Sequence, residues 1–258
     1  MLEIYQVDAF TKDKFKGNPA GVCPLQEWLP DADLQNIASE LNLSETAFFV
    51  PLDNGFHLRW FTPTTEVRLC GHATLAAAHV IFSHLDYKAN EICFKTNKVG
   101  ELNVYKLDDA YQMNFPVDIP QAFSSNYINQ LINTDVLECR VGTDDLLLLV
   151  RDHESVKNCR PNLEIMKSLE HRAIIVTAQG RDVDFVSRVF APAVGIDEDP
   201  VTGSAHTVLT PFWAEKLNKK KLSATQISLR SGNLSCELNN DRVLLTGNAV
   251  TTIVGKIL

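Results

Sequence analysis

Apolar and polar residues along this chain follow the periods of strands and helices in both halves. Alternating residues, or short apolar runs between turn residues, predict strands. An N-terminal strand is predicted over Met1–Asp8. The further predicted strands are 47–50, 56–61, 91–95, 101–106 and 111–115 in the first half and 146–150, 173–178, 184–190, 225–229, 235–238 and 242–247 in the second.

Two longer apolar segments predict helices. Leu75–Leu85 and Thr207–Leu217 are apolar on most sides, which is typical of helices buried in a core. Pro211 lies inside the second segment, so we expect that helix to kink or to begin again there. Two shorter helices are predicted, from Asp31 or Asp33 to Leu41 and over 162–169.

A short pattern precedes each long apolar segment. In the first half Phe61-Thr62-Pro63 leads to Cys70-Gly71-His72-Ala73-Thr74, and in the second Phe190-Ala191-Pro192 leads to Thr202-Gly203-Ser204-Ala205-His206. No further copy follows, so the chain reads as a duplication rather than a solenoid. We therefore expect two related lobes, at 1–116 and 117–250.

Each copy of the pattern puts a glycine at the predicted start of a helix. Open backbone N–H groups and the helix dipole attract anions there. If the halves pair about a pseudo-twofold axis, the starts at Gly71 and at Gly203 and Ser204 could hold a carboxylate or an enolate-like charge between them. The alternative is structural: the glycines permit close backbone approach, and Ser204 is an ordinary helix cap.

Composition narrows the classes of function. The 258 residues carry a formal net charge of −8 and no long basic face, which disfavours nucleic acid or an anionic membrane as the partner. No apolar stretch is long enough to span a membrane, and the N-terminus does not read as a signal peptide. Six cysteines without a C-x-x-C pair favour reduced thiols, a cytoplasmic location and no structural metal.

Several further motifs accompany the repeated pattern. They are Val7-Asp8-Ala9-Phe10, Gly17-Asn18-Pro19-Ala20-Gly21-Val22, Ser44-Glu45-Thr46-Ala47-Phe48, Glu66 and Asp199-Pro200-Val201. Together, in this order, they resemble the phenazine-biosynthesis-like isomerases, which share the fold of diaminopimelate epimerase. The resemblance implies an α/β (α+β) fold of two lobes, each a curved, mostly antiparallel sheet or barrel around a central apolar helix. Residues 251–258 are candidates for completing the first lobe.

The resemblance also implies a reaction and a site. It implies an isomerase that transfers a proton on a small carboxylate-bearing substrate in the cleft between the lobes, without metal, flavin or pyridoxal phosphate, often as a homodimer. By motif, Glu45 is the acid/base, with His72 and Asp199 as further catalytic residues. The implied substrate-binding residues are Ser44, Gly71, Gly203 and Ser204.

Each of these residues also has a structural interpretation. Glu45 could cap a strand entry or pair with a lysine, His72 could bond locally at its helix start, and Asp199 could supply favourable charge there. A general base works best with a pKa near the working pH; burial raises the pKa of a glutamate, whereas nearby helix ends lower it. The sequence leaves this balance open.

Two other functions stay open. Racemases of this fold class that use two thiols place a cysteine before each central helix; Cys70 stands at the first position, but Asp199-Pro200-Val201 supplies no thiol at the second. An epimerase or racemase is therefore less favoured than an isomerase. A scaffold or interaction protein of the same fold would have the same motifs without turnover.

Overall fold

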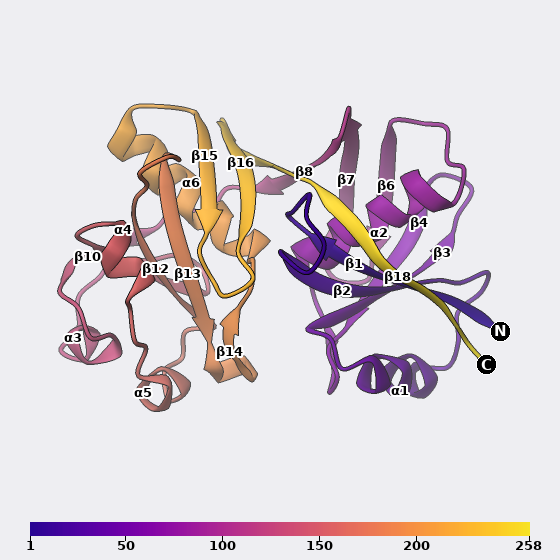
Figure 1. Ribbon diagram of the computed structural model, residues 1–258, viewed down its shortest axis with the longest axis horizontal. Coiled ribbons are helices and arrows are strands. Elements are labelled where there is room, and N and C mark those ends of the chain that lie inside the picture. Colours follow the sequence, from indigo (N-terminus) through magenta and orange to yellow (C-terminus); the bar gives the residue numbers. More distant parts are fainter. The chain divides into compact units, whose positions relative to one another are not determined.

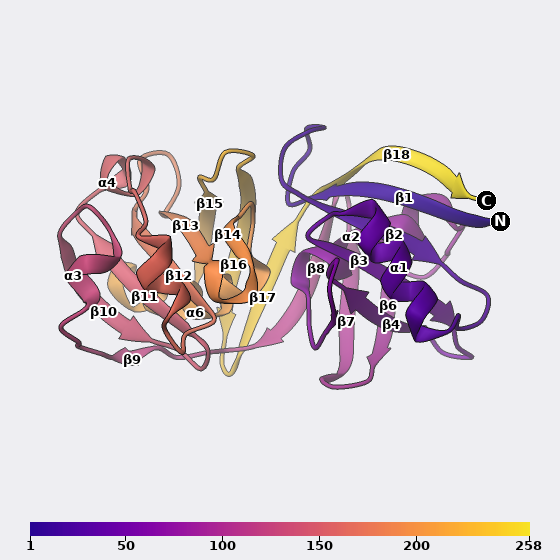
Figure 2. The same cartoon turned by 90° about the horizontal axis from the view of Figure 1, so that it is seen from below.

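The computed structural model describes residues 1–258 and divides into two compact units (Figure 1). Unit 1 comprises Met1–Asn114 and Thr246–Leu258, and unit 2 comprises Phe115–Leu245. The C-terminal strand of unit 1 runs antiparallel beside its N-terminal strand, with Leu2 opposite Ile257 (Figure 2). The sequence predicts only residues 251–258 in this unit, whereas the segment that returns to it begins at Thr246.

Unit 1 is a mixed sheet around one long helix. Its elements are β1 (Leu2–Ala9), β2 (Asn18–Pro24), α1 (Asp31–Leu41), β3 (Glu45–Pro51), β4 (Phe56–Phe61), β5 (Glu66–Val67), α2 (Gly71–His84), β6 (Glu91–Thr96), β7 (Gly100–Leu107), β8 (Ala110–Pro116) and β18 (Ala249–Ile257). Successive neighbours in the sheet are β18, β1, β2, β3, β4, β6, β7 and β8. The pairs β2–β3 and β4–β6 are parallel, and the others are antiparallel.

Unit 2 repeats this plan. Its elements are β9 (Gln121–Ala122), α3 (Ile128–Leu131), β10 (Val136–Val141), β11 (Asp145–Val150), α4 (His153–Lys157), α5 (Leu163–Lys167), β12 (Ala173–Gln179), β13 (Phe185–Ala191), the 3₁₀ turn η1 (Pro192–Val194), β14 (Ile196–Asp199), α6 (Gly203–Leu217), β15 (Lys221–Gln226), β16 (Gly232–Asn239) and β17 (Arg242–Gly247). The pairs β11–β12 and β13–β15 are parallel, at the places where unit 1 has β2–β3 and β4–β6.

An ion pair occurs at the same place in both units. In unit 1, Arg59 binds both carboxylate oxygens of Glu66 at 2.8 Å, and its guanidinium lies 5.0 Å from the ring centroid of Phe61. In unit 2, Arg188 binds Glu198 at 2.7 and 2.8 Å and lies 4.9 Å from the ring of Phe190. The shared strand order and this shared pair confirm the two-lobed α/β fold inferred from the repeated pattern.

The two long helices form the centres of their units. Figure 2 shows α2 between β1 and β6, and ten of its residues are buried. Four of these are alanines, which let the strands approach closely. In α6 the buried residues run from Gly203 to Ala214. Both segments lack a polar face because strands cover them on most sides.

Helix α6 continues through Pro211, where the sequence analysis expected a kink or a new start. Proline has no N–H to donate to the carbonyl four residues earlier, that of Thr207. In the structure the N–H of Asp118 donates to this carbonyl at 3.2 Å. The broken bond is therefore replaced from outside the helix, and the assigned helix runs from Gly203 to Leu217.

One predicted strand is misplaced. The sequence analysis put it at 225–229, whereas β15 covers Lys221–Gln226 with Leu222, Ala224 and Gln226 buried. The start of β15 was missed because Lys219-Lys220-Lys221 show no alternation of apolar and polar residues there. After β15 the chain turns, and Leu229 is 96% exposed. Strand β10 was not predicted. None of its residues is buried, so packing does not impose an alternation of apolar and polar residues on it.

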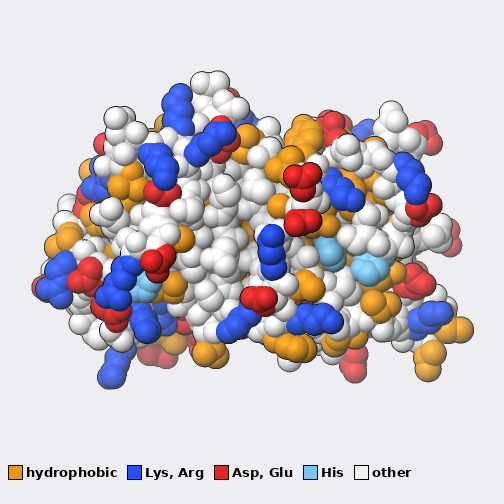
Figure 3. All heavy atoms as spheres, turned by 45° about the horizontal axis from the view of Figure 1, so that its top comes forward, with side chains coloured by type: hydrophobic (Ala, Val, Ile, Leu, Met, Phe, Trp, Pro, Cys, Tyr) orange, Lys and Arg blue, Asp and Glu red, His pale blue; other side chains and the backbone are white.

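Lysines are concentrated at Lys216 and Lys219-Lys220-Lys221, and most of them form ion pairs. Lys216 pairs with Glu138 at 2.6 Å, Lys219 with Asp184 at 2.6 Å and Lys221 with Glu237 at 3.5 Å. On the face drawn in Figure 3, basic and acidic side chains are interspersed. These three lysines therefore serve as ion-pair partners within unit 2. None of the helices is long and apolar enough to cross a membrane, and all six cysteines are free thiols.

Candidate active site

Glu45 is the first residue of β3, where that strand enters the sheet. Its register partner in the parallel strand β2 is Ala20. The side chain of Glu45 is 12% exposed, so its carboxylate sits in a largely dry position that solutes can still reach. Ser44, which directly precedes it, is half-buried.

His72 lies in the first turn of α2 and faces Glu45. Its Nε2 atom is 3.3 Å from Oε2 of Glu45. Its Nδ1 atom lies 3.2 Å from Nδ2 of Asn18, the first residue of β2, and 3.4 Å from Sγ of Cys70. Strand β2, strand β3 and helix α2 thus place Asn18, Glu45 and His72 next to one another.

The contacts of the His72 ring assign its tautomer. With the amide nitrogen of Asn18 placed toward Nδ1, Nδ1 accepts, and this assignment puts the hydrogen of the neutral ring on Nε2. Burial lowers the pKa of His72 to about 3, which keeps the ring neutral near pH 7. Nε2 is buried and has no hydrogen-bond partner, although Oε2 of Glu45 lies 3.3 Å away. A buried, unsatisfied N–H beside a carboxylate is available for a third group.

The start of α2 is open to an anion. Its N-cap residue, Cys70, provides no side-chain hydrogen bond, and its first turn contains no acidic residue. The short helices α4 and α5 differ, because Asp152 and Asn162 cap them through their side chains. Gly71 and His72 therefore present backbone N–H groups and the positive end of a 14-residue helix.

The predicted residues of the second half gather at the start of α6 in unit 2. Asp199 ends β14 and is 9% exposed, and its Oδ2 accepts the hydroxyl hydrogen of Thr202 at 2.5 Å. The side chain of Gln226 accepts from the Thr202 N–H at 2.9 Å and donates to the Asp199 carbonyl at 2.6 Å. Asp199 is thus tied to the N-cap residue of α6, and its role toward substrate stays a prediction.

Gly203 and Ser204 are the first two residues of α6. As in α2, neither a side-chain cap nor an acidic residue occupies this first turn. The equivalence of the two helices extends to position five of the repeated pattern: Thr74 Oγ1 donates to the Cys70 carbonyl at 2.6 Å, and His206 Nδ1 donates to the Thr202 carbonyl at 2.8 Å. Each unit therefore has its own open helix start, and their use in one shared site stays a prediction.

Asn18 is the site residue that the sequence analysis left without a role. Asn18 was named only as part of the motif Gly17-Asn18-Pro19-Ala20-Gly21-Val22. Gly17 has φ +62°, and a Cβ atom on it would lie 2.1 Å from the carbonyl oxygen of Ala9, so only glycine fits. This tight turn positions the side chain of Asn18 beside the ring of His72. An asparagine directly after a required glycine, inside a motif, was the available signal.

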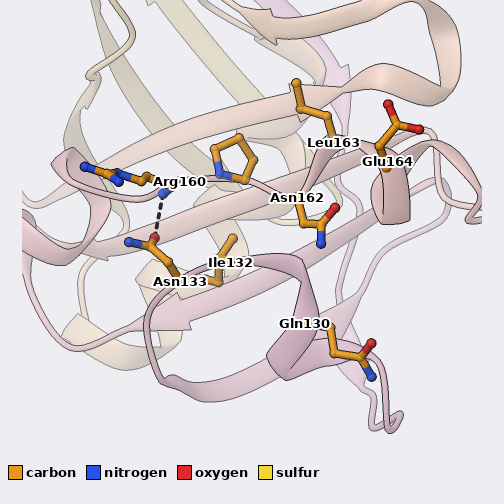
Figure 4. Close-up of a pocket in the computed structure, with 8 residues that line it drawn as sticks. Gln130, Ile132, Asn133, Arg160, Asn162, Leu163 and Glu164 are labelled. Carbon is orange, nitrogen blue, oxygen red and sulfur yellow. Dashed lines mark hydrogen bonds between the residues drawn. The ribbon is translucent and has the colours of Figure 1, made fainter.

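Two open hollows lie elsewhere, both in unit 2. One, of about 480 Å³, is lined by polar and apolar residues around Asn133, Arg160 and Asn162. The backbone N–H of Arg160 donates to Asn133 Oδ1 there at 2.6 Å (Figure 4). The other, of about 570 Å³, includes Thr143 and Arg172. Neither contains a predicted site residue, so the candidate active site rests on the chemistry of the residues around His72.

Comparison with known proteins gives consistent matches over the whole chain. The family described as "Phenazine biosynthesis-like protein" matches residues 7–255. A protein of Pseudomonas aeruginosa named an uncharacterized isomerase is 47% identical, with 99% of this chain and 98% of that protein covered. A crystal structure of a PhzF-family phenazine biosynthesis protein from Enterococcus faecalis is 42% identical, with a TM-score of 0.97 and 100% and 99% of the two chains covered.

A more distant neighbour shows the fold alone. The structure of a probable proline racemase from Agrobacterium radiobacter is 9% identical with a TM-score of 0.62, over 100% of this chain and 93% of that one. This likeness agrees with the two-lobed epimerase-like fold that the motifs implied.

Proposed function

Because the chain belongs to the phenazine biosynthesis-like protein family, we propose that it is an isomerase that moves a proton between two carbons of a small carboxylate-bearing substrate. The proposal includes catalysis by the chain's own side chains, without metal or organic cofactor. One observation carries it: the buried Nε2 atom of His72 has no hydrogen-bond partner and lies 3.3 Å from Oε2 of Glu45.

Glu45 is the proposed base and acid. Its carboxylate takes a proton from a carbon next to an unsaturated system, and the electron pair of the broken C–H bond moves into that system. The same carboxyl group then returns the proton to a second carbon, so no proton or electron is gained or lost. A positioned base of this kind contributes about 10² to 10⁴ in rate.

His72 is the proposed hydrogen-bond donor to the oxygen on which negative charge develops. Its low pKa means that it donates as a neutral group and keeps its proton. One such donor is worth roughly 10² to 10³ in rate. The backbone N–H groups at the start of α2 would bind the substrate carboxylate. Asp199 at the end of β14 and Gly203 and Ser204 at the start of α6 would add contacts.

Only the first of the two duplicated units has a carboxylate at the position of Glu45. Sheet register gives Glu45 the position that Ala173 occupies in unit 2: Glu45 pairs with Ala20 across parallel strands, as Ala173 pairs with Asp145. The N-cap residues of the central helices likewise differ, with Cys70 in α2 and Thr202 in α6. A reaction with two thiols is therefore disfavoured, and a single carboxylate favours isomerization over racemization.

Product analysis tests the proposal. A panel of cyclic and acyclic unsaturated amino and hydroxy acids is incubated with the protein, and new isomers are detected by proton NMR. We expect a positional isomer with wild type and with the exposed control Glu40→Gln, and none with Glu45→Gln. If a carboxylate of the panel stabilises the protein against unfolding but no compound gives a product, the scaffold alternative is supported. A ligand at 100 times its Kd raises the free energy of unfolding by about 2.7 kcal/mol.

The protein is also proposed to act as a homodimer. Ile253 and Val254 on β18 are 54% and 62% exposed, which supports an apolar contact with a second copy. Sedimentation equilibrium of wild type against Ile253→Lys tests this proposal: a shift from dimer to monomer supports it, and a monomeric wild type contradicts it.

A further inference from the structure

We propose that Glu45, Cys70 and His72 bind a thiophilic divalent cation such as Zn²⁺, and that the bound cation inhibits the protein. One ligand atom from each of these three residues lies within 4.8 Å of the others. Binding is a property of these side chains alone, whereas inhibition rests on the proposed function. Turnover would then fall when such a metal is available.

The donor set suits zinc. A thiolate, an imidazole nitrogen and a carboxylate oxygen are the three kinds of ligand that zinc takes in proteins, and three protein ligands leave one tetrahedral position open. A thiolate and a carboxylate together offset the two positive charges of the ion, which matters in a largely buried place. Cys70 is 7% and His72 5% exposed, so the ligands are nearly dry but can be reached.

The distances support coordination by Cys70 and His72. Bonds of about 2.3 Å to sulfur and about 2.0 Å to nitrogen separate the two ligands of a tetrahedral zinc by roughly 3.5 Å. Sγ of Cys70 and Nδ1 of His72 are 3.4 Å apart. Glu45 now approaches the other ring nitrogen, so it reaches the metal by rotation of its side chain. The metal would replace the contact of Asn18 with Nδ1.

Metal binding at these residues releases a proton. Nδ1 of the assigned tautomer already offers a lone pair, so His72 loses no proton. The Cys70 thiol releases one, and the Glu45 carboxylate donates as it is. One proton leaves per metal ion, and affinity therefore rises with pH. Inhibition follows because the metal occupies the carboxylate that the proposed reaction needs to accept a proton from carbon.

Cobalt gives a direct readout without substrate. Thiolate bound to Co²⁺ produces a near-ultraviolet charge-transfer band, so wild type, Cys70→Ser and the control Cys93→Ser are titrated with Co²⁺ and then with Zn²⁺. Cys93 is a half-buried thiol on β6 outside the cluster. We expect a band that saturates at one equivalent and is displaced by Zn²⁺ in wild type and in the control, and no band in Cys70→Ser.

Glu45→Gln gives a second, graded test. Loss of a residue that only hydrogen-bonds to a metal ligand weakens metal binding by roughly 10- to 100-fold. Loss of the direct ligand Glu45 should weaken Co²⁺ binding by more than this. A folded wild type without the band, or a band that survives in Cys70→Ser, would overturn the site. Deuterium exchange by metal-free protein tests the proposed function separately: a band without exchange supports the site and refutes the proposed function. Exchange that saturating Zn²⁺ leaves unchanged refutes only the inhibition.

Discussion

His72 holds its Nε2 atom 3.3 Å from Oε2 of Glu45, while Asn18 holds the opposite ring nitrogen at 3.2 Å. The three residues come from a helix and two parallel strands that pack on one another, so the fold itself sets their spacing. The arrangement fixes which nitrogen can donate. It makes the orientation of one asparagine a determinant of the proposed chemistry.

Changing Asn18 should change the tautomer of His72. In Asn18→Asp a carboxylate faces Nδ1 and accepts a hydrogen, which moves the imidazole hydrogen away from Nε2 or charges the ring. We expect kcat to fall by about 10² to 10³, as for the loss of one donor, and the nitrogen chemical shifts of His72 to change accordingly.

Asn97→Asp is the matched control for this substitution. Asn97 contacts His57 in an exposed pair, at 2.9 Å, outside the candidate site. It should leave kcat and the His72 signals as in wild type. Unchanged His72 shifts in Asn18→Asp, with both proteins folded, would refute the assigned role of Asn18.

The stability of the protein should fall in mild acid because buried histidines stay neutral. Burial lowers the pKa of His206 to about 4, from an ordinary value near 6.5. Between these two values the unfolded chain binds a proton that the folded chain does not. The stabilising contribution of neutral His206 is therefore complete above pH 6.5 and is lost as the pH falls toward 4, by about 1.4 kcal/mol per pH unit.

His206→Thr isolates this contribution. Thr74 occupies the equivalent place in α2 and bonds the equivalent carbonyl, so threonine keeps the local hydrogen bond without a titrating ring. Urea unfolding at pH 7, 6 and 5 should show a shallower pH dependence in His206→Thr than in wild type, whatever the cost of the smaller side chain at pH 7. Equal slopes would contradict the prediction.

Asp145 and Arg172 should show strong coupling. Asp145 is 2% exposed in its side chain, and Arg172 binds both of its oxygens, at 3.0 and 2.5 Å. Burial outweighs the attraction of Arg172 and raises the pKa of Asp145. Arg172→Met would leave a buried carboxylate without its cation, and we expect a loss of about 3 kcal/mol in the free energy of unfolding.

A double-mutant cycle measures this coupling. Asp145→Asn combined with Arg172→Met should be more stable than Arg172→Met alone, because the neutral amide is less costly to bury. Thermal or urea unfolding of the four proteins gives the coupling energy. Additive losses from the two substitutions would show that the pair does not act as a unit.

Local patterns made the two central helices and the duplication predictable, and the resemblance of the motifs supplied the fold class. The long apolar runs before His84 and Leu217 and the glycine starts at Gly71 and Gly203 are properties of adjacent residues, and α2 and α6 begin and end close to them. Features that depend on distant residues were not predictable. The helix through Pro211 needs the N–H of Asp118, which lies far away in the sequence.

The candidate site shows the same division. Motifs selected Glu45 and His72, and the structure brings these two side chains into contact. Which ring nitrogen faces Glu45 could not be predicted, because Asn18, which fixes it, is 54 residues away from His72. Asp199 was selected too, but its bond to Thr202 Oγ1 could only be seen once β14 and α6 were placed. The catalytic roles of all three stay predictions.

Solvent deuterium incorporation tests the central claim most directly. Wild type, Glu45→Gln and Cys70→Ala are incubated in D₂O with the unsaturated amino and hydroxy acids, and exchange at carbon is followed by NMR. We predict exchange in wild type and in Cys70→Ala and its loss in folded Glu45→Gln. Exchange that survives in Glu45→Gln but disappears in Cys70→Ala would contradict the account and place the proton transfer on the thiol.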